Sequence, residues 1–240
     1  MKYTNSKVNS SMLFLLLLFL STQIVAQNKH KDAYADAFEF GLYHSFNLTT
    51  IVGSFPDINT ANVKQKTSLT SPRFTFDLGM SVDYYLNKQF SLQFDALFTY
   101  NGGHFINTRS IYNEVGRIEH NEWYTYSMSY FQFPLSVVFY PKEQLYISGG
   151  AYIGTLIHSQ KYHYWFETGT QPIADINPLD YGLQFGMGFN MSFVKIGFQY
   201  SYGLADIITN SSYNLHHSDY KLVVRWKFSS DIRDRKKEIE

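Results

Sequence analysis

Five segments of this chain alternate between large apolar residues and small or polar ones. They are residues 74–84, 90–100, 181–191, 194–204 and 220–228, and Leu97 interrupts the pattern in the second of them. None of the 29 positions on the large-residue faces carries a charged side chain. A period of two is typical of strands whose faces meet different surroundings, and no stretch shows the 3.6-residue period of an amphipathic helix. The pattern predicts an all-β protein.

Three further strands, at 38–49, 130–140 and 145–157, follow the alternation less regularly and bring the predicted total to eight. The connections alternate in length. Residues 50–73, 101–127, 158–180 and 205–219 form long ones, and residues 87–89, 141–144 and 192–193 form short ones. This alternation is typical of an up-and-down barrel with periplasmic turns and longer external loops. We predict an eight-stranded antiparallel up-and-down transmembrane β-barrel over residues 38–228.

A soluble eight-stranded barrel of the lipocalin type is the competing interpretation, because it uses the same alternation inside out. The polar face of such a barrel would meet water and would be rich in Lys and Glu. Here that face carries mainly Gly, Gln, Ser and Asn in 181–191 and 194–204, and charged residues make up only 17% of the chain, against about a quarter in soluble domains. Small polar residues suit a narrow lumen. The bulky face is therefore expected to contact lipid.

The first 26 residues have the layout of a secretory signal peptide: basic Lys2 and Lys7, an apolar run at 12–20, and the small residue Ala26. A retained anchor is the alternative, but the run is too short for a spanning helix. We therefore expect a signal peptide at 1–26, a short periplasmic segment at 27–37, the barrel, and a charged periplasmic tail at 229–240. This layout predicts the outer membrane of a Gram-negative cell, with both termini in the periplasm.

The alternation also places eight charged side chains on the inward face. They are Glu39, Asp77, Asp83, Asp95, Lys195, Lys221, Arg225 and Lys227. The acids lie on the first three strands and the bases on the last two, which become neighbours when the barrel closes. We expect Glu39 to lie near Arg225 and Lys227 at the periplasmic rim. Because buried charges need partners, we predict a lumen ion-pair network that plugs the barrel; the alternative is a charged passage for ions.

The residues predict neither a catalytic site, nor a cofactor, nor a metal site. The chain has no Cys, and its loop histidines show no ligand spacing. These histidines are His104, His120, His158, His163, His216 and His217. His44 and Ser45 are adjacent on a strand, so their side chains point to opposite faces and cannot form a base–nucleophile pair. With 20 basic and 20 acidic residues, the chain has no excess positive charge for nucleic acid.

Several phrases resemble the PorT-like outer-membrane β-barrel family of Bacteroidetes-type bacteria. They are FSLQFDALFTYNGG (90–103), YFQFPLSVVFY (130–140), LYISGGAYIG (145–154), DYGLQFGMGFN (180–190) and YGLAD (202–206). The resemblance implies an outer-membrane barrel without an established active site. It also implies a link to the type IX secretion and gliding machinery, with which the founding member is associated.

The function that we expect is a structural or interaction role through long external loops, above a plugged polar lumen. Outer-membrane lipid is the expected surrounding, and protein partners would bind the external loops or the C-terminal tail. Two alternatives stay open at this point. One is an outer-membrane enzyme acting at the external rim, and the other is an accessory component of a type IX-like secretion machinery.

Overall fold

The computed structural model describes residues 36–54, 58–59, 63–113, 116–163, 173, 175–209 and 214–230. They form ten strands: β1 (Ala37–Ser54), β2 (Ile58–Asn59), β3 (Val63–Ser71), β4 (Arg73–Tyr85), β5 (Phe90–Asn113), β6 (Gly116–Lys142), β7 (Leu145–His163), β8 (Leu179–Asn190), β9 (Val194–Gly203) and β10 (Asn214–Ser230). No helix long and apolar enough to cross a bilayer occurs among these residues. The predicted signal peptide, and the predicted tail from residue 231 onward, lie outside the described residues.

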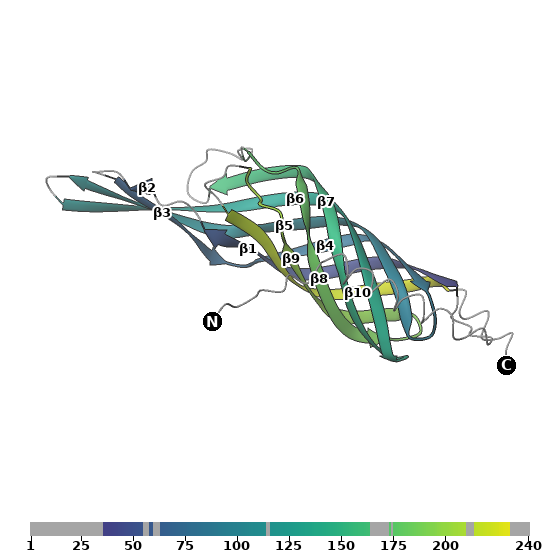
Figure 1. Cartoon of the computed structure of the whole chain (residues 1–240). Coiled ribbons are helices and arrows are strands. Elements are labelled where there is room, and N and C mark those ends of the chain that lie inside the picture. Colours follow the sequence, from purple (N-terminus) through teal and green to yellow (C-terminus); the bar gives the residue numbers. More distant parts are fainter. Residues whose placement is uncertain are drawn as a thin grey trace, which may run out of the picture.

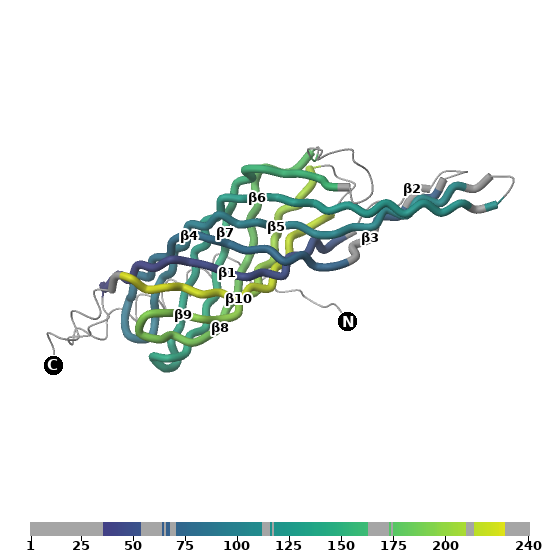
Figure 2. Tube along the Cα trace, turned by 180° about the vertical axis from the view of Figure 1, so that it is seen from behind, coloured from purple at the N-terminus to yellow at the C-terminus, as the bar shows by residue number. Residues whose placement is uncertain are grey.

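Eight of the ten strands close into a ring of antiparallel pairs (Figure 1). Their order is β5-β4-β1-β10-β9-β8-β7-β6, and β6 pairs back to β5. β1 and β10, the purple and yellow strands of Figure 2, lie side by side, joined by a ladder from Glu39 opposite Ser230 to Ser54 opposite Asn214. Closure removes the unpaired edge that lipid cannot satisfy. The predicted eight-stranded antiparallel up-and-down barrel is confirmed, and each predicted strand matches one strand of the ring.

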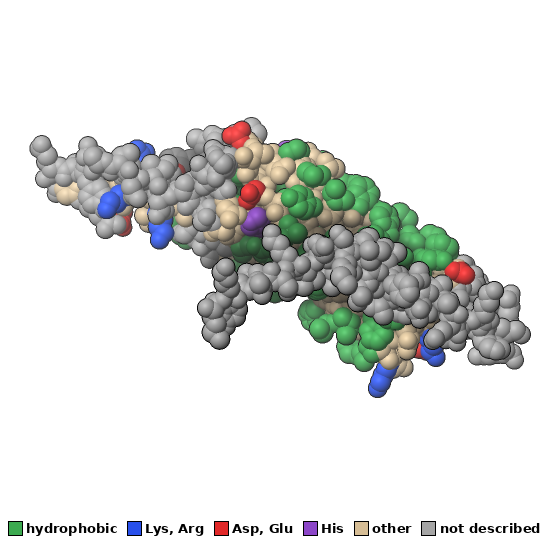
Figure 3. All heavy atoms as spheres, in the orientation of Figure 1, with side chains coloured by type: hydrophobic (Ala, Val, Ile, Leu, Met, Phe, Trp, Pro, Cys, Tyr) green, Lys and Arg blue, Asp and Glu red, His purple; other side chains and the backbone are tan. Residues whose placement is uncertain are grey.

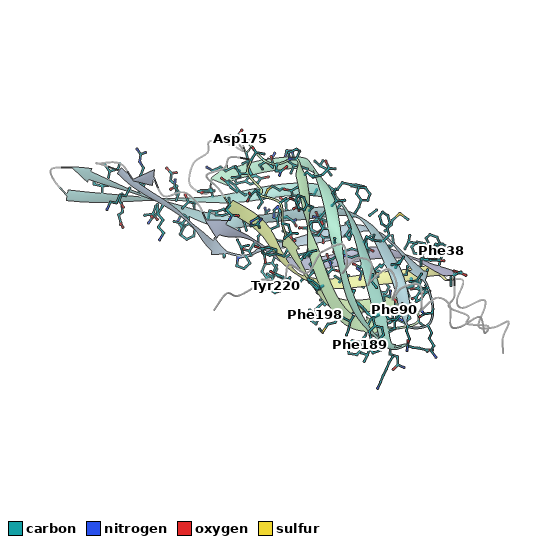
Figure 4. The ribbon with its side chains drawn as sticks, viewed as in Figure 1. Phe38, Phe90, Asp175, Phe189, Phe198 and Tyr220 are labelled. Atoms are coloured by element: carbon teal, nitrogen blue, oxygen red, sulfur yellow. The ribbon has the colours of Figure 1, made fainter. Side chains whose placement is uncertain are left out.

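The wall of the barrel has an apolar outer face and a polar inner face. We define the apolar belt as the outward residues of 38–48, 74–84, 90–98, 131–139, 145–157, 179–189, 196–204 and 220–228. Hydrophobic side chains cover much of the wall in Figure 3, and Phe189, Phe198 and Tyr220, labelled in Figure 4, are 58%, 71% and 62% exposed. The intervening residues are largely buried inside the ring. This inversion of a soluble protein is what a lipid surrounding requires.

The rim with short connections also holds the two ends of the described barrel. Its turns are residues 86–89 between β4 and β5, 143–144 between β6 and β7, and 191–193 between β8 and β9. In the first turn, the Asn87 side chain accepts hydrogen bonds from the backbone N–H groups of Gln89 and Phe90, at 2.8 and 2.9 Å. Asp36 and Ser230, the two described ends, lie at this same rim, because β1 and β10 are antiparallel.

Two of the connections predicted to be long loops are largely strand. β5 and β6 continue their pairing without interruption from Leu97 opposite Gln132 out to Asn113 opposite Gly116. β3 pairs with the outer part of β5, and β2 pairs with β3. We call this assembly the external sheet: β2, β3, residues 101–113 of β5 and residues 116–128 of β6. It projects well beyond the ring at the rim opposite the short turns (Figure 1).

Charged substitutions on the lipid-facing side of the wall should lower the stability of the barrel. Phe94 and Met187 are 46% and 61% exposed within the apolar belt. Phe94→Arg or Met187→Arg should lower the free energy of unfolding by about 2–4 kcal/mol, because a cation near the bilayer midplane is poorly solvated. Urea titration in lipid vesicles measures this. Met187→Leu is the matched control and should change little; Arg variants as stable as that control would contradict the assignment.

Candidate functional site in the barrel lumen

The inner face of the ring collects the eight charged residues named from the alternation. β1, β4 and β5 contribute the acids, and β9 and β10 contribute the bases. Asp77, Asp95 and Lys195 are at most 1% exposed, and Arg225 is 4% exposed. We call these eight residues the lumen ladder. They face inward because they share the parity of the buried positions on their strands.

The lumen ladder consists of four ion pairs. From the short-turn rim outward they are Lys227–Glu39 at 3.2 Å, Lys195–Asp83 at 2.8 Å, Arg225–Asp95 at 3.1 Å and Lys221–Asp77 at 2.8 Å. Only the first joins neighbouring strands, β10 and β1. The other three reach across at least one intervening strand of the ring. The ladder therefore ties the first half of the barrel to the second through its interior.

The sequence predicted Glu39 near both Arg225 and Lys227; all three line one pocket, but Arg225 is not the residue that pairs with Glu39. Arg225 lies opposite Tyr43 in the β1–β10 ladder, and a register shift at Phe40/Gly41 follows further along. Its guanidinium reaches across the lumen and pairs with Asp95, and Glu39 pairs with Lys227 instead. Parity along a strand fixes which face a side chain occupies, but it does not fix which strand a long side chain reaches across a narrow lumen.

Aromatic rings and polar side chains hold the ladder in position. The Arg225 guanidinium carbon lies 4.7 Å from the centroid of the Tyr43 ring, and the Lys195 ammonium lies 5.3 Å from that of Tyr140. The Ser45 hydroxyl donates to Asp77 at 3.0 Å. These contacts supply cation–π attraction and hydrogen bonds to charges that have left water.

Three further residues of the lumen were missed because they fell inside predicted long connections. Asp219 lies 3.9 Å from the Lys221 ammonium, Asp180 accepts from Gln132 at 3.4 Å, and His217 Nε2 lies 3.3 Å from the Tyr130 hydroxyl. All three are at most 3% exposed. Continuing the parity of β10 back from Lys221 would have found Asp219 and His217, but Ser218 breaks the large-residue pattern on the other face.

The outer end of the lumen is filled by apolar side chains. A buried cluster brings together residues of β1, β5, β6 and β10 with the segment before β10: Ile51, Phe105, Tyr124, Met128, Tyr130, Ile207, Ile208 and Leu215. At the opposite end a small pocket opens onto the ladder, lined by Glu39, Phe40, Gly41, Ser81, Asp83, Lys195, Arg225 and Lys227. The polar interior is therefore covered by an apolar cap on the outer side.

The side-chain positions bear on two kinds of site considered from the sequence, a metal site and a base–nucleophile pair. Among the described residues, no group of three His, Asp or Glu side chains could hold a metal ion. His44 lies on the outer face, and Ser45 is buried inside, where its hydroxyl contacts Asp77. Of the histidines assigned to loops, His217 is buried in the lumen, and His104 lies on β5 with its Nδ1 2.8 Å from the Thr125 hydroxyl.

A double-mutant cycle tests the pairing within the ladder. Asp95→Asn or Arg225→Met should each lower the free energy of unfolding by about 3–5 kcal/mol, because each leaves a buried charge without its partner. The double variant should lose much less than the sum of the two. The cycle of Glu39→Gln with Arg225→Met is the comparison; these residues line one pocket without forming an ion pair, so their coupling should be much weaker. Coupling to Glu39 as strong as that to Asp95 would contradict the observed pairing.

Several solved structures are similar to this chain. The chain is similar to Ail, the attachment invasion locus protein of Yersinia pestis, solved with the heparin analogue sucrose octasulfate: 15% identity over 80% of this chain and 99% of that one, with a TM-score of 0.43. It is similar to Neisserial surface protein A, with 12% identity over 79% and 97% and a TM-score of 0.43. It is also similar to OprG of Pseudomonas aeruginosa, with 9% identity over 82% and 98% and a TM-score of 0.41.

Sequence comparison gives the family. None of the curated protein sequences matches this chain. The family described as "Outer membrane protein beta-barrel domain" matches residues 25–209, which is more than half of the chain. The predicted location, the outer membrane of a Gram-negative cell, is confirmed by this match. The protein is an integral membrane protein that belongs to the outer membrane protein β-barrel domain family.

Proposed function

We propose that this protein is a non-catalytic interaction protein of the outer membrane. In this proposal the external sheet is the surface that contacts partners, and the lumen ladder is a plug that keeps the barrel closed. The rim with the short turns then faces the periplasm, as in other barrels of this kind. The predicted signal peptide at 1–26 and the periplasmic tail belong to the same proposal.

The external sheet is the observation that carries the proposal. β5 and β6 are 24 and 27 residues long, whereas a membrane-spanning strand needs about 9–11. The excess length is hydrogen-bonded hairpin, widened by β3 and β2. A paired sheet holds its side chains in fixed positions, so a partner would bind it with less ordering of the chain than a flexible loop requires.

The side chains of the external sheet suit a protein partner. Ile118 and Trp123, both on β6, are 56% and 42% exposed outside the apolar belt. The same sheet carries charged residues of both signs, among them Lys64, Lys66, Arg109, Glu119 and Glu122. An exposed aromatic residue within a polar surround is typical of protein–protein contact sites.

The interior supports the plug. Four ion pairs occupy the lumen of an eight-stranded ring, which leaves room for little more than side chains. The apolar cluster around Ile51 and Tyr130 covers the outer end. A solute would have to displace both sets of contacts to pass. This arrangement favours closure over a charged passage for ions.

The phrases shared with PorT-like barrels favour one class of partner. We propose on that basis that the chain is a PorT-like member of its family and an accessory component of a type IX-like secretion assembly. Co-purification of secretion components with the native protein would support this narrower proposal. Capture of unrelated surface proteins alone would leave the interaction role in place and remove the secretion role.

Shortening the hairpin tests the interaction role. Asn107 lies opposite Glu122, so residues 108–121 can be replaced by an Asn-Gly turn that closes the hairpin at this pair. The ring should still form, which unheated migration on SDS gels checks. Proteins that co-purify with the intact chain from native outer membranes should be lost or strongly reduced.

A substitution within the intact hairpin tests the same surface without shortening the strands. Trp123→Ser keeps the full length of both strands and should weaken capture of the same partners, because it removes an exposed aromatic contact. Undiminished capture by the shortened protein would contradict the role of the external sheet.

A further inference from the structure

The apolar belt contains one residue that does not suit it. The outward side chains of β1 are those of Phe38, Phe40, Leu42, His44, Phe46 and Leu48. Among the outward residues of the belt, His44 is the only Asp, Glu, Lys, Arg or His. It lies near the middle of this series, opposite Leu78 on β4 and Val224 on β10, which are also central in their segments. An ionisable residue at the bilayer midplane is rare on a lipid-facing surface.

The imidazole of His44 is partly covered by its own chain, whereas the other outward side chains of β1 are exposed. Its ring and that of Phe46 form a T-shaped contact, with 4.5 Å between centroids and 89° between planes. In the described part of the chain, neither ring nitrogen forms a hydrogen bond. A T-shaped contact between rings is weak and does not replace a hydrogen bond to either ring nitrogen. The hydrocarbon region offers no water to replace the missing partners.

We propose that the face of β10, β1 and β4 centred on His44 is an interface with a second copy of this chain within the membrane. A neutral imidazole carries one donor and one acceptor nitrogen, so two copies complement each other in an N–H···N hydrogen bond. Two barrels inserted in the same direction place His44 at the same depth. A two-fold axis along the membrane normal then brings the two rings together, as in most soluble two-subunit assemblies.

The side chains around His44 suit such a contact. Leu42, Phe46 and Leu78 are 52%, 59% and 48% exposed, and Leu222 on β10 is 39% exposed. They form an apolar surround that would shield a central hydrogen bond from competing polar groups. Another membrane protein would need a polar group at this depth and position, whereas a second copy supplies one by symmetry.

Energy transfer between labelled copies tests the proposal. The chain has no Cys, so Gln89→Cys in the exposed β4–β5 turn gives a single labelling site. Donor- and acceptor-labelled proteins are reconstituted in phosphatidylcholine vesicles and diluted with lipid. We expect transfer above the random level, and His44→Leu should raise the dissociation constant about three- to thirtyfold, the range for polar contacts in membranes. His44→Gln, which keeps a donor and an acceptor, should retain most of the association.

Matched controls separate the interface from general effects on folding. Thr155→Val removes a lipid-facing hydroxyl from β7, on the other side of the ring, and should leave energy transfer unchanged. Unheated migration on SDS gels verifies that each variant is a closed barrel. Random-level transfer in the original chain, or equal dissociation constants for His44→Leu and the original, would overturn the proposal. So would a photo-crosslinker at Leu42 that captures only a different protein in native membranes.

Discussion

Backbone hydrogen bonding in the absence of water is the constraint on which the rest of this structure depends. Within the hydrocarbon region an unpaired N–H or C=O group costs several kcal/mol, so a sheet that crosses the membrane must close on itself. The ladder between β1 and β10 provides this closure. It joins residues that lie between 160 and 191 positions apart in the sequence, from Ser54 opposite Asn214 to Glu39 opposite Ser230. Its register sets where every inward and outward side chain of the two strands lies.

Closure of the ring removes the inward charged side chains from water, and the lumen ladder supplies each of them with a partner. An eight-stranded ring leaves an interior too narrow for bulk water, so each inward charge needs a partner within reach. Acids on the early strands and bases on the late ones meet only when the ring is complete. The ion pairs therefore form together with the closed topology. We infer that they favour the correct ring over open or misregistered sheets, in addition to filling the lumen.

The sequence predicted the ring well, because period two leaves a strong signal wherever one face meets lipid. The uninterrupted apolar face of 181–191 is an example. The external sheet was not predicted, since its outer part, residues 107–122, carries mainly polar side chains and no alternating apolar face that would mark the strands. The inward positions of all eight ladder residues followed from parity. The pairing of Arg225 with Asp95 did not, because it depends on the reach of a side chain across the lumen. The alternation of 38–49 is less regular because polar His44 occupies an outward position and bulky Tyr43 an inward one.

The contact between Lys221 and Asp77 offers the most direct test of the central claim that buried ion pairs tie the two halves of the barrel together. Their ammonium nitrogen and carboxylate oxygen lie 2.8 Å apart although the residues are separated by β1 in the ring. Solid-state NMR of the isotopically labelled protein in lipid bilayers can detect a dipolar correlation between Lys221 Nζ and Asp77 Cγ. We expect a strong correlation, with both side chains rigid. A mobile Lys221 without that correlation would contradict it.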